Sequence, residues 1–277
     1  MQSQPYPLIS VLTCTYNSEK FLEQALRSVE VQTYAHIEHI INDSFSSDRT
    51  LEIIQAYIRR NQGRYPIRLI QSEPQGVANA LNVITTYARG DVVHYLHSDD
   101  YYVDATALER AAAYFTKDPS LMWITGNFLV EIKNRQIVIP QTHLLRINPY
   151  KVLSAMNIIH HENTFVKREV ITDYGGFNEN KRSVVEYGIW LHLIEKYEPL
   201  ILNEEFTVFI VHPGSTSTGS VLKFSQAILR AFYTQKQEKV FPFIGYYPDN
   251  DFYLLYRRLV EQAQLFIDLF DFDNLLK

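Results

Sequence analysis

The chain has 277 residues, of which 46% are hydrophobic and 21% are charged, a composition that excludes intrinsic disorder. Its formal net charge is −5 and it has no basic block, so nucleic acid is not an expected partner. The single cysteine, Cys14, excludes an intrachain disulfide and any multi-cysteine zinc or iron–sulfur site.

The chain also gives indications of its location. It has no uninterrupted apolar run near the roughly 20 residues that cross a bilayer. Residues 1–5 lack the basic start and apolar core of a secretory signal. We therefore expect a cytoplasmic protein, or one held peripherally at the inner face of the cell membrane.

Strands and helices are expected to alternate over the first hundred residues. Short runs rich in β-branched residues predict strands at 8–13, 37–41, 67–70 and 92–96. Helical spacing predicts helices at 21–29, capped by Asn17 or Ser18, at 51–58, capped within 46–48, and at 77–88. This order predicts an α/β fold with a mainly parallel central sheet and helices on both faces. The ligand site of such a sheet forms from the loops after its strands, here 13–18, 42–48, 71–79 and 97–104.

The second half is less regular. It predicts helices at 104–115 and 184–197, a hairpin of 122–132 and 136–139, and strands at 163–166 and 206–211. We expect one domain over residues 1–219 and a helical, aromatic extension over 220–277. The default role of the extension is packing on the domain. A homodimer contact and a contact with a membrane-bound lipid acceptor are the alternatives.

Acidic residues follow two of the predicted strands. Asp99 and Asp100 are adjacent, and two carboxylates in a cleft need donors or a cation such as Mg²⁺ or Mn²⁺. The alternative is a solvated turn in which Asp100 or Asp104 caps the next helix. Asp43 ends the second strand and could accept hydrogen bonds from a nucleobase or ribose, or it could form an Asx turn or cap. Neither G-x-G-x-x-G nor a P-loop motif is present, which excludes dinucleotide oxidoreductases and P-loop enzymes.

Several stretches, in this order and spacing, together resemble the inverting glycosyltransferases of family 2, which have the GT-A fold. The likeness ends near residue 219, so the predicted extension lies outside it. The matching stretches are Pro7 to Asn17 with its T-Y-N turn, Ser28-Val29 with Gln32-Thr33-Tyr34, Ile40 to Thr50, Ser72-Glu73-Pro74 with Gly76, Ala80 and Asn82, Ala88 to Asp91, Ser98-Asp99-Asp100, Gly175-Gly176-Phe177, Trp190-Leu191 and His212 to Ser215.

The resemblance implies a nucleotide-diphospho-sugar donor, a UDP-, GDP- or dTDP-sugar, bound with Mn²⁺ or Mg²⁺ by the N-terminal half. Asp99 would hold the metal, with Asp100 beside it, and His212 would be a further metal or diphosphate ligand. A surface histidine without a ligand is the alternative for His212. The remaining donor-binding positions that the resemblance implies are Thr15, Tyr16 and Asn17 around the base and ribose, Asp43 toward the base, and Asn79 and Ser98.

The resemblance also implies a catalytic base. Relatives commonly carry an aspartate at the start of D-Y-D-L-W, and Glu186 of Glu186-Tyr187-Gly188-Ile189-Trp190 falls on it. Such a base takes the proton of the acceptor hydroxyl as its oxygen attacks the anomeric carbon. The alternative is an exposed glutamate favoured by the helix dipole. Trp190 itself is expected to be core.

Other positions depart from the family pattern. His97 stands where many relatives carry the first aspartate of D-x-D, Asn79 where a subset carries aspartate, and Leu81 where many carry arginine. Ser44, Phe45 and Arg49 occupy a loop that is usually rich in glycine. For the adjacent His160 and His161, a strand would point the two rings to opposite faces, so at most one is expected to enter the cleft.

These features together predict a metal-dependent inverting glycosyltransferase of the hexosyltransferase type. Its acceptor would be a sugar or a lipid-linked saccharide in bacterial surface-polysaccharide or glycoconjugate synthesis. One alternative is a catalytically silent nucleotide-sugar-binding protein, which would be expected to lose Asp99 or Glu186. A nucleotidyltransferase is another, but it needs a glycine-rich, basic loop near the first strand, and residues 13–18 have none.

Overall fold

The computed structural model describes residues 6–139, 149–155, 157–180, 185–212 and 214. The extension predicted over 220–277 lies outside these residues, together with its packing, dimer and membrane contacts. Within the described part, no helix combines the length and the apolar character that crossing a membrane requires.

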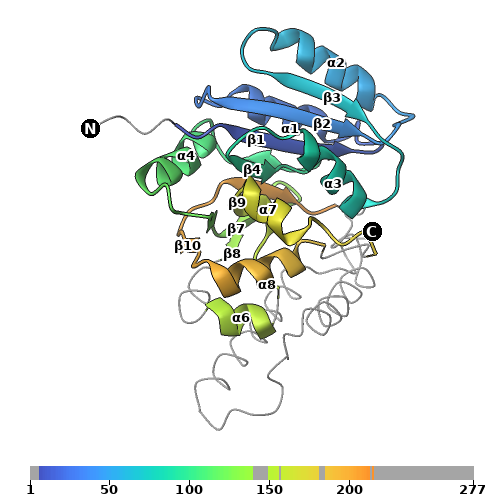
Figure 1. The fold of residues 1–277 in the computed structure, drawn as a ribbon. Coiled ribbons are helices and arrows are strands. Elements are labelled where there is room, and N and C mark those ends of the chain that lie inside the picture. The colour runs from blue at the N-terminus through green and yellow to red at the C-terminus, as the bar shows by residue number, and fades with distance from the viewer. Residues whose placement is uncertain (1–5, 140–148, 156, 181–184, 213, 215–277) are drawn as a thin grey trace.

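The described residues form a main sheet of seven strands with β1 near its middle (Figure 1). Its strands, in spatial order, are β10 (Leu200–Ile201), β6 (Trp123–Thr125), β9 (Thr164–Lys167), β4 (Val92–Tyr95), β1 (Ile9–Thr15), β2 (Ile37–Asp43) and β3 (Ile67–Gln71). The pairs β1–β2, β2–β3, β1–β4 and β6–β10 are parallel, whereas β9 runs antiparallel to both β4 and β6. The mainly parallel sheet is therefore confirmed.

Helices cover both faces of this sheet, because alternate residues of each strand point to opposite faces. Ile9 and Val11 of β1 pack with the helices of one face, and Leu12 packs with those of the other. The first face carries α1 (Leu22–Glu30), α2 (Thr50–Arg60) and α4 (Ala107–Lys117). The second carries α3 (Val77–Tyr87), α6 (Pro149–Ala155), α7 (Arg168–Tyr174) and α8 (Tyr187–Lys196).

The predicted strand over 122–132 is wrong in one respect, because it is interrupted at Gly126 and Asn127. The backbone N–H of Gly126 donates to the Asn163 carbonyl, and that of Asn127 donates to the Glu204 carbonyl. The chain thus leaves the main sheet after β6 and enters a second one. The second sheet has the order β5 (Tyr101–Tyr102), β11 (Thr207–Ile210), β7 (Phe128–Ile132) and β8 (Arg135–Ile139).

The predicted hairpin is confirmed between β7 and β8. Lys133 and Asn134 form its two-residue turn, with φ of 48° and 63°. Two left-handed residues match the twist of the flanking antiparallel strands.

The caps predicted for the first helix are wrong. Phe21 precedes α1 and no side chain caps the helix, while Asn17 has a left-handed φ of 49° and belongs to the preceding loop. For the second helix, Asp48 Oδ1 accepts the N–H of Thr50, so the predicted capping segment does serve its first turn. The helices α6 and α7 and the 3₁₀ turn η1 (His161–Asn163) were not among the predicted elements.

Candidate functional site

The four loops expected to form the site are joined by hydrogen bonds at one edge of the main sheet. The register that pairs Thr15 with Asp43 and Asp43 with Gln71 brings the ends of β1, β2 and β3 together. The fourth loop joins through Ser98, whose hydroxyl lies 3.0 Å from that of Ser18. The four loops therefore meet at the edge of the sheet where the site was predicted.

Asp43 lies at the centre of this loop cluster and is fully buried. Its Oδ1 accepts hydrogen bonds from Thr15 Oγ1 at 2.9 Å and Ser46 Oγ at 2.5 Å, and its Oδ2 accepts one from the Ser46 N–H at 3.0 Å. The turn contact with Ser46 is the one that the Asx-turn alternative predicts. Asp43 thus shapes the loop, and its carboxylate also faces Gln71 Nε2 at 3.4 Å.

The T-Y-N turn is held against the same loop. Asn17 N–H donates to Ser46 Oγ, and Asn17 Oδ1 accepts the N–H of Ser47, each at 2.9 Å. Tyr16 is 59% exposed, so its ring is free to contact a ligand. Across the loop, Phe45 has a φ of 53° and is half exposed. A phenylalanine therefore holds the left-handed conformation that glycine would adopt without strain.

Asp100 does not cap the next helix. Its Oδ1 accepts the N–H of Ile210 at 3.0 Å, whereas Asp104 is the residue that accepts the Thr106 N–H just before α4. Asp100 is buried, and its Oδ2 has no hydrogen-bond partner among the described residues. Burial and the neighbouring carboxylates of Asp99 and Glu162 raise the pKa of Asp100 well above its usual range.

Asp99 is paired with His212, which arrives on the segment after β11. His212 Nε2 donates to Asp99 Oδ2 at 2.9 Å, and the Phe21 ring packs against the imidazole with its centroid 4.3 Å away. Burial by itself raises the pKa of Asp99, but the hydrogen bond from His212 and the charge of His97 outweigh it, and the net shift is downward. Asp99 therefore remains an anion, and the two residues that the resemblance implied as metal ligands lie side by side.

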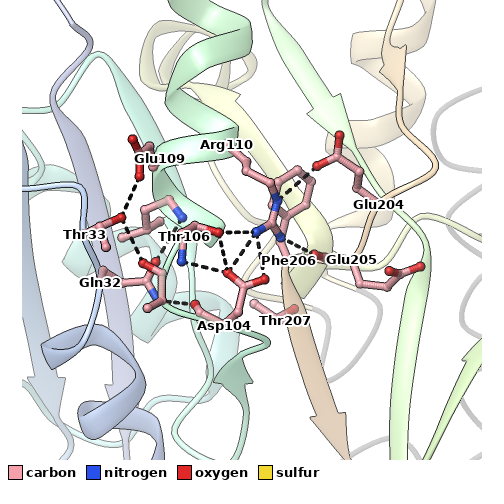
Figure 2. A network of polar contacts seen from close by, with 12 residues as sticks. Gln32, Thr33, Asp104, Thr106, Glu109, Arg110, Glu204, Glu205, Phe206 and Thr207 are labelled. Atoms are coloured by element: carbon pink, nitrogen blue, oxygen red, sulfur yellow. Dashed lines mark hydrogen bonds and ion pairs between the residues drawn. The ribbon is translucent and has the colours of Figure 1, made fainter.

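A polar network holds the chain just before β11, the strand that leads to His212 (Figure 2). Arg110 of α4 donates through Nη1 to both oxygens of Asp104 at 2.8 Å and through Nη2 to the Glu205 carbonyl at 2.9 Å. Its Nε donates to Glu204 Oε2 at 3.2 Å. These bonds fix the chain just before β11. The hydrogen bond from the Ile210 N–H to Asp100 fixes the end of β11.

Glu186 precedes the first turn of α8, as the resemblance implied. It is partly buried, and its Oε1 accepts a 3.0 Å hydrogen bond from Asn157 Nδ2. Burial, and to a lesser degree the Glu162 carboxylate, raise the pKa of Glu186 above its ordinary value. The exposed helix-start glutamate of the alternative interpretation is therefore not what the structure has. A carboxylate with a raised pKa is a stronger base.

The two adjacent histidines do point to different surroundings, but the segment is a 3₁₀ turn and not a strand. His160 stacks on Phe128, and His161 packs against Tyr95, His97 and Trp190. Trp190 is fully buried and its ring is parallel to that of Trp123, which confirms it as core.

The other predicted positions are less central in the structure. Asn79 donates to Glu179 Oε2 at 3.2 Å. Leu81 is buried in the core. It therefore cannot serve in place of the arginine that many relatives carry at this position.

Asn157 was missed from the sequence, and Glu162, part of a segment that resembles one near the acceptor side in the family, was given no role of its own. Glu162 Oε1 lies 3.6 Å from His97 Nε2. Glu162 is adjacent to the paired histidines, but its significance depends on His97, which lies far earlier in the sequence. Asn157 lies in no recognised motif.

The described residues offer a small donor set for a divalent cation. None of their His, Cys, Asp and Glu side chains form a group of three or more that could hold a metal. Asp99 and His212 form a pair from two separate segments, and a carboxylate with an imidazole is a donor set that Mn²⁺ accepts. Two protein ligands leave the remaining positions to phosphate oxygens and water, the usual arrangement at nucleotide sites. The residues present therefore suit such an ion.

Comparison with known proteins identifies a family. A family model described as "Glycosyl transferase family 2" matches residues 10–185. The chain is 30% identical over 214 residues to chondroitin synthase of Pasteurella multocida, an alignment that covers 76% of this chain and 21% of the relative. It therefore spans about a fifth of the length of that relative.

Two solved structures share the fold. The Staphylococcus aureus enzyme TarS, residues 1–349 in complex with UDP, aligns with a TM-score of 0.60 at 21% identity, over 82% of this chain and 64% of that one. The mannosyltransferase PcManGT of Pyrobaculum calidifontis, in complex with GDP-Man and Mn²⁺, aligns with a TM-score of 0.58 at 17% identity, over 95% of this chain and 81% of that one. The GT-A fold predicted from the sequence is confirmed.

Proposed function

Because this chain belongs to glycosyl transferase family 2, we propose that it is a metal-dependent, inverting glycosyltransferase that moves a hexose-type sugar from a nucleotide diphosphate to a hydroxyl acceptor. One observation carries the proposal. Asp99 with its His212 partner and Glu186 with its Asn157 partner are electrostatic neighbours of the same side chain, His97. This shared neighbour supports assigning the candidate metal ligand Asp99 and the candidate base Glu186 to one site.

Donor binding falls to the loop cluster around Asp43. The buried Asp43 keeps residues 15–18 and 44–47 in place, and the exposed Tyr16 ring offers a flat apolar face to a base. We assign Asn17, Ser98 and Asn79 to the same donor site. UDP, GDP and dTDP remain the candidate nucleotides.

Asp99 and His212 are the residues that would hold Mn²⁺ or Mg²⁺, with the buried Asp100 fixing the segment behind them. A bound divalent cation would neutralise charge that builds up on the diphosphate as it leaves. The downward pKa shift of Asp99 suits this role, because only the ionised carboxylate is a ligand.

Glu186 would accept the proton of the acceptor hydroxyl. As that proton moves to the carboxylate, the acceptor oxygen forms a bond to the anomeric carbon and the bond from that carbon to the diphosphate oxygen breaks. The attack comes from the side opposite the leaving group, so the configuration at the anomeric carbon inverts. The partly buried position of Glu186 and its raised pKa support this assignment.

The acceptor is a sugar or a lipid-linked saccharide in this proposal, and the product is part of a surface polysaccharide or glycoconjugate. Support comes from the names of relatives, which include chondroitin synthase of Escherichia coli and the poly(ribitol-phosphate) β-N-acetylglucosaminyltransferase TarS of Staphylococcus aureus. Neither name fixes the sugar or the linkage made by this chain.

The test is a calorimetric titration of UDP, GDP and dTDP, each with and without Mn²⁺, followed by assays of sugar release and transfer with the matching sugar donors. We expect one nucleotide to bind in a Mn²⁺-dependent way and its sugar donor to be consumed. Binding without any consumption would identify a silent nucleotide-sugar-binding protein. No binding to any of the three would overturn the proposal.

A further inference from the structure

Glu162 of η1 and His97 of the loop after β4 lie side by side in the site. Glu162 Oε1 and His97 Nε2 are 3.6 Å apart, and the side chains are 10% and 28% exposed. That separation is too long for a hydrogen bond, so both groups keep hydrogen-bonding capacity. Both are also close enough to Glu186 to shift its pKa, and both interact electrostatically with Asp99.

The backbone of Glu162 is firmly held. Its carbonyl accepts a 2.8 Å hydrogen bond from His94 Nε2 and a 2.6 Å hydrogen bond from Thr207 Oγ1. Its carboxylate, in contrast, receives no hydrogen bond from any side chain in the described part of the chain, and burial raises its pKa. A buried carboxylate whose only donor is its own backbone N–H is costly, which suggests that a ligand supplies further donors.

A second, independent observation concerns the neighbours of this pair. His161 Nε2 and Trp190 Nε1 are buried atoms without a hydrogen-bond partner among the described residues, and their side chains are 5% and 0% exposed. The His161 ring lies 5.7 Å from the rings of both His97 and Trp190. Buried polar atoms are nearly always paired, so the orphaned Nε2 of His161, the residue adjacent to Glu162, supports a polar ligand here.

A sugar ring suits this place. During transfer the anomeric carbon must lie between the diphosphate, next to Asp99, and the acceptor oxygen, next to Glu186. The remaining hydroxyls of that ring then need partners, and each hydroxyl both donates and accepts hydrogen bonds.

We propose that the Glu162 carboxylate, together with His97 and His161, binds hydroxyl groups of the transferred sugar and so determines which sugar this enzyme accepts. The inference rests on the proposed glycosyl transfer. An ionised carboxylate only accepts hydrogen bonds, so Glu162 would select hydroxyls that point toward it and reject sugars that lack one there.

The experiment compares binding of a nucleoside diphosphate with binding of its sugar esters by calorimetry in Mn²⁺. The probes are UDP with UDP-glucose, UDP-galactose, UDP-N-acetylglucosamine and UDP-N-acetylgalactosamine, and GDP with GDP-mannose. The variant is Glu162→Gln, which keeps the shape and removes the charge. Its matched control is Glu38→Gln, the same change at a buried glutamate at the opposite end of β2, where Ser10 Oγ and the Gly90 N–H donate to it.

We expect Glu162→Gln to weaken binding of the preferred nucleotide sugar about tenfold or more, the loss expected for a hydrogen bond to a charged group. Binding of the nucleoside diphosphate should stay unchanged, and the preference among the sugars should shrink. Glu38→Gln should lower the melting temperature without changing either the preference or the difference between diphosphate and sugar ester.

An unchanged preference and affinity in Glu162→Gln would overturn the inference while leaving the proposed transfer intact. A wild-type chain that binds neither UDP nor GDP nor their sugar esters would instead sink the proposed function, and this inference with it. If Glu162→Gln does not fold, as its melting curve would show, His97→Asn decides in its place. That variant should likewise lose affinity for the sugar ester alone, and an unchanged sugar preference in it would overturn the inference.

Discussion

Asn157 Nδ2 donates a 3.0 Å hydrogen bond to Glu186 Oε1, and no other side chain of the described residues donates to that carboxylate. Burial raises the pKa of Glu186, the Glu162 carboxylate adds to the rise, and the bond from Asn157 opposes it because it stabilises the ionised form. Asn157 thus favours the ionised form of Glu186, the base in the proposed mechanism. In that mechanism it is a positioning residue, and no motif in the sequence indicates it.

Asn157→Ala should raise the pKa of Glu186 further. Since only the ionised carboxylate can accept a proton, the acid limb of the pH profile of kcat should move to higher pH. The rate well above the limb should fall much less than the rate below it. The measurement is kcat against pH for both proteins, and an acid limb at the wild-type position would show that Asn157 does not act through Glu186.

Glu186→Gln should bind the donor like the wild type and lose transfer by about a hundredfold or more, the usual contribution of a general base. Glu186→Asp keeps a carboxylate but shortens its reach, so it should retain part of the rate. Donor binding by calorimetry and initial rates of transfer give the comparison. Glu195→Gln, an exposed change on the same helix, is the control and should transfer normally. Wild-type rates in Glu186→Gln would exclude it as the base.

Asp99→Asn should abolish the part of nucleotide binding that depends on Mn²⁺, because a neutral amide is a much weaker ligand. His212→Asn should weaken Mn²⁺ more than Mg²⁺, since an imidazole ligand favours the transition metal. The measurement is a Mn²⁺ titration in the presence of the nucleotide, followed by electron paramagnetic resonance. The control, Asp173→Asn, alters an exposed aspartate on α7. Undiminished Mn²⁺ affinity in Asp99→Asn would place the ion elsewhere.

Local patterns predicted much of the fold and the acids at the sheet edge. The alternation of strands and helices fixed which loops share an edge, and Asp43 and Asp99 lie on two of them. The break at Gly126 was not predicted, because the run on both sides of it is continuously strand-like. It depends on partners far away in the sequence, the carbonyls of Asn163 and Glu204.

The same limit applies to the site. Asp100 looked like a cap because capping is a local rule, whereas its partner is the N–H of Ile210, 110 residues later in the chain. Glu162 becomes significant only through its distance to His97 and its lack of side-chain donors. Such pairings depend on the packed tertiary structure, which spacing along one chain does not contain.

The stability of the fold should decrease as the pH falls below neutral. Burial lowers the pKa of His39 from its ordinary 6.5 to about 3. The imidazole ring is hydrogen-bonded to Thr13 Oγ1 and to Tyr57 OH. Between these two values the unfolded chain binds the proton and the folded chain does not, so this contribution is complete above pH 6.5 and is lost as the pH falls. Each such histidine lowers the free energy of unfolding by about 1.4 kcal/mol per pH unit.

Urea unfolding at several pH values between 7 and 4 would measure this slope. His39→Gln removes the titrating group while keeping a polar side chain, so its slope should be smaller than that of the wild type by about 1.4 kcal/mol per pH unit. Equal slopes in the two proteins would mean that His39 is protonated in the folded state.

Gly126→Ala should destabilise the protein by about 1–3 kcal/mol, the usual cost of an overpacked site. A methyl group at this position would clash with the carbonyl oxygen of Glu204 and come within 3.3 Å of the Phe206 ring. The carbonyl belongs to the backbone held by Arg110 and Asn127, so it cannot turn away as a flexible side chain would. Urea unfolding gives the free energy, and unchanged stability would show that the two sheets separate at Gly126 without needing a glycine there.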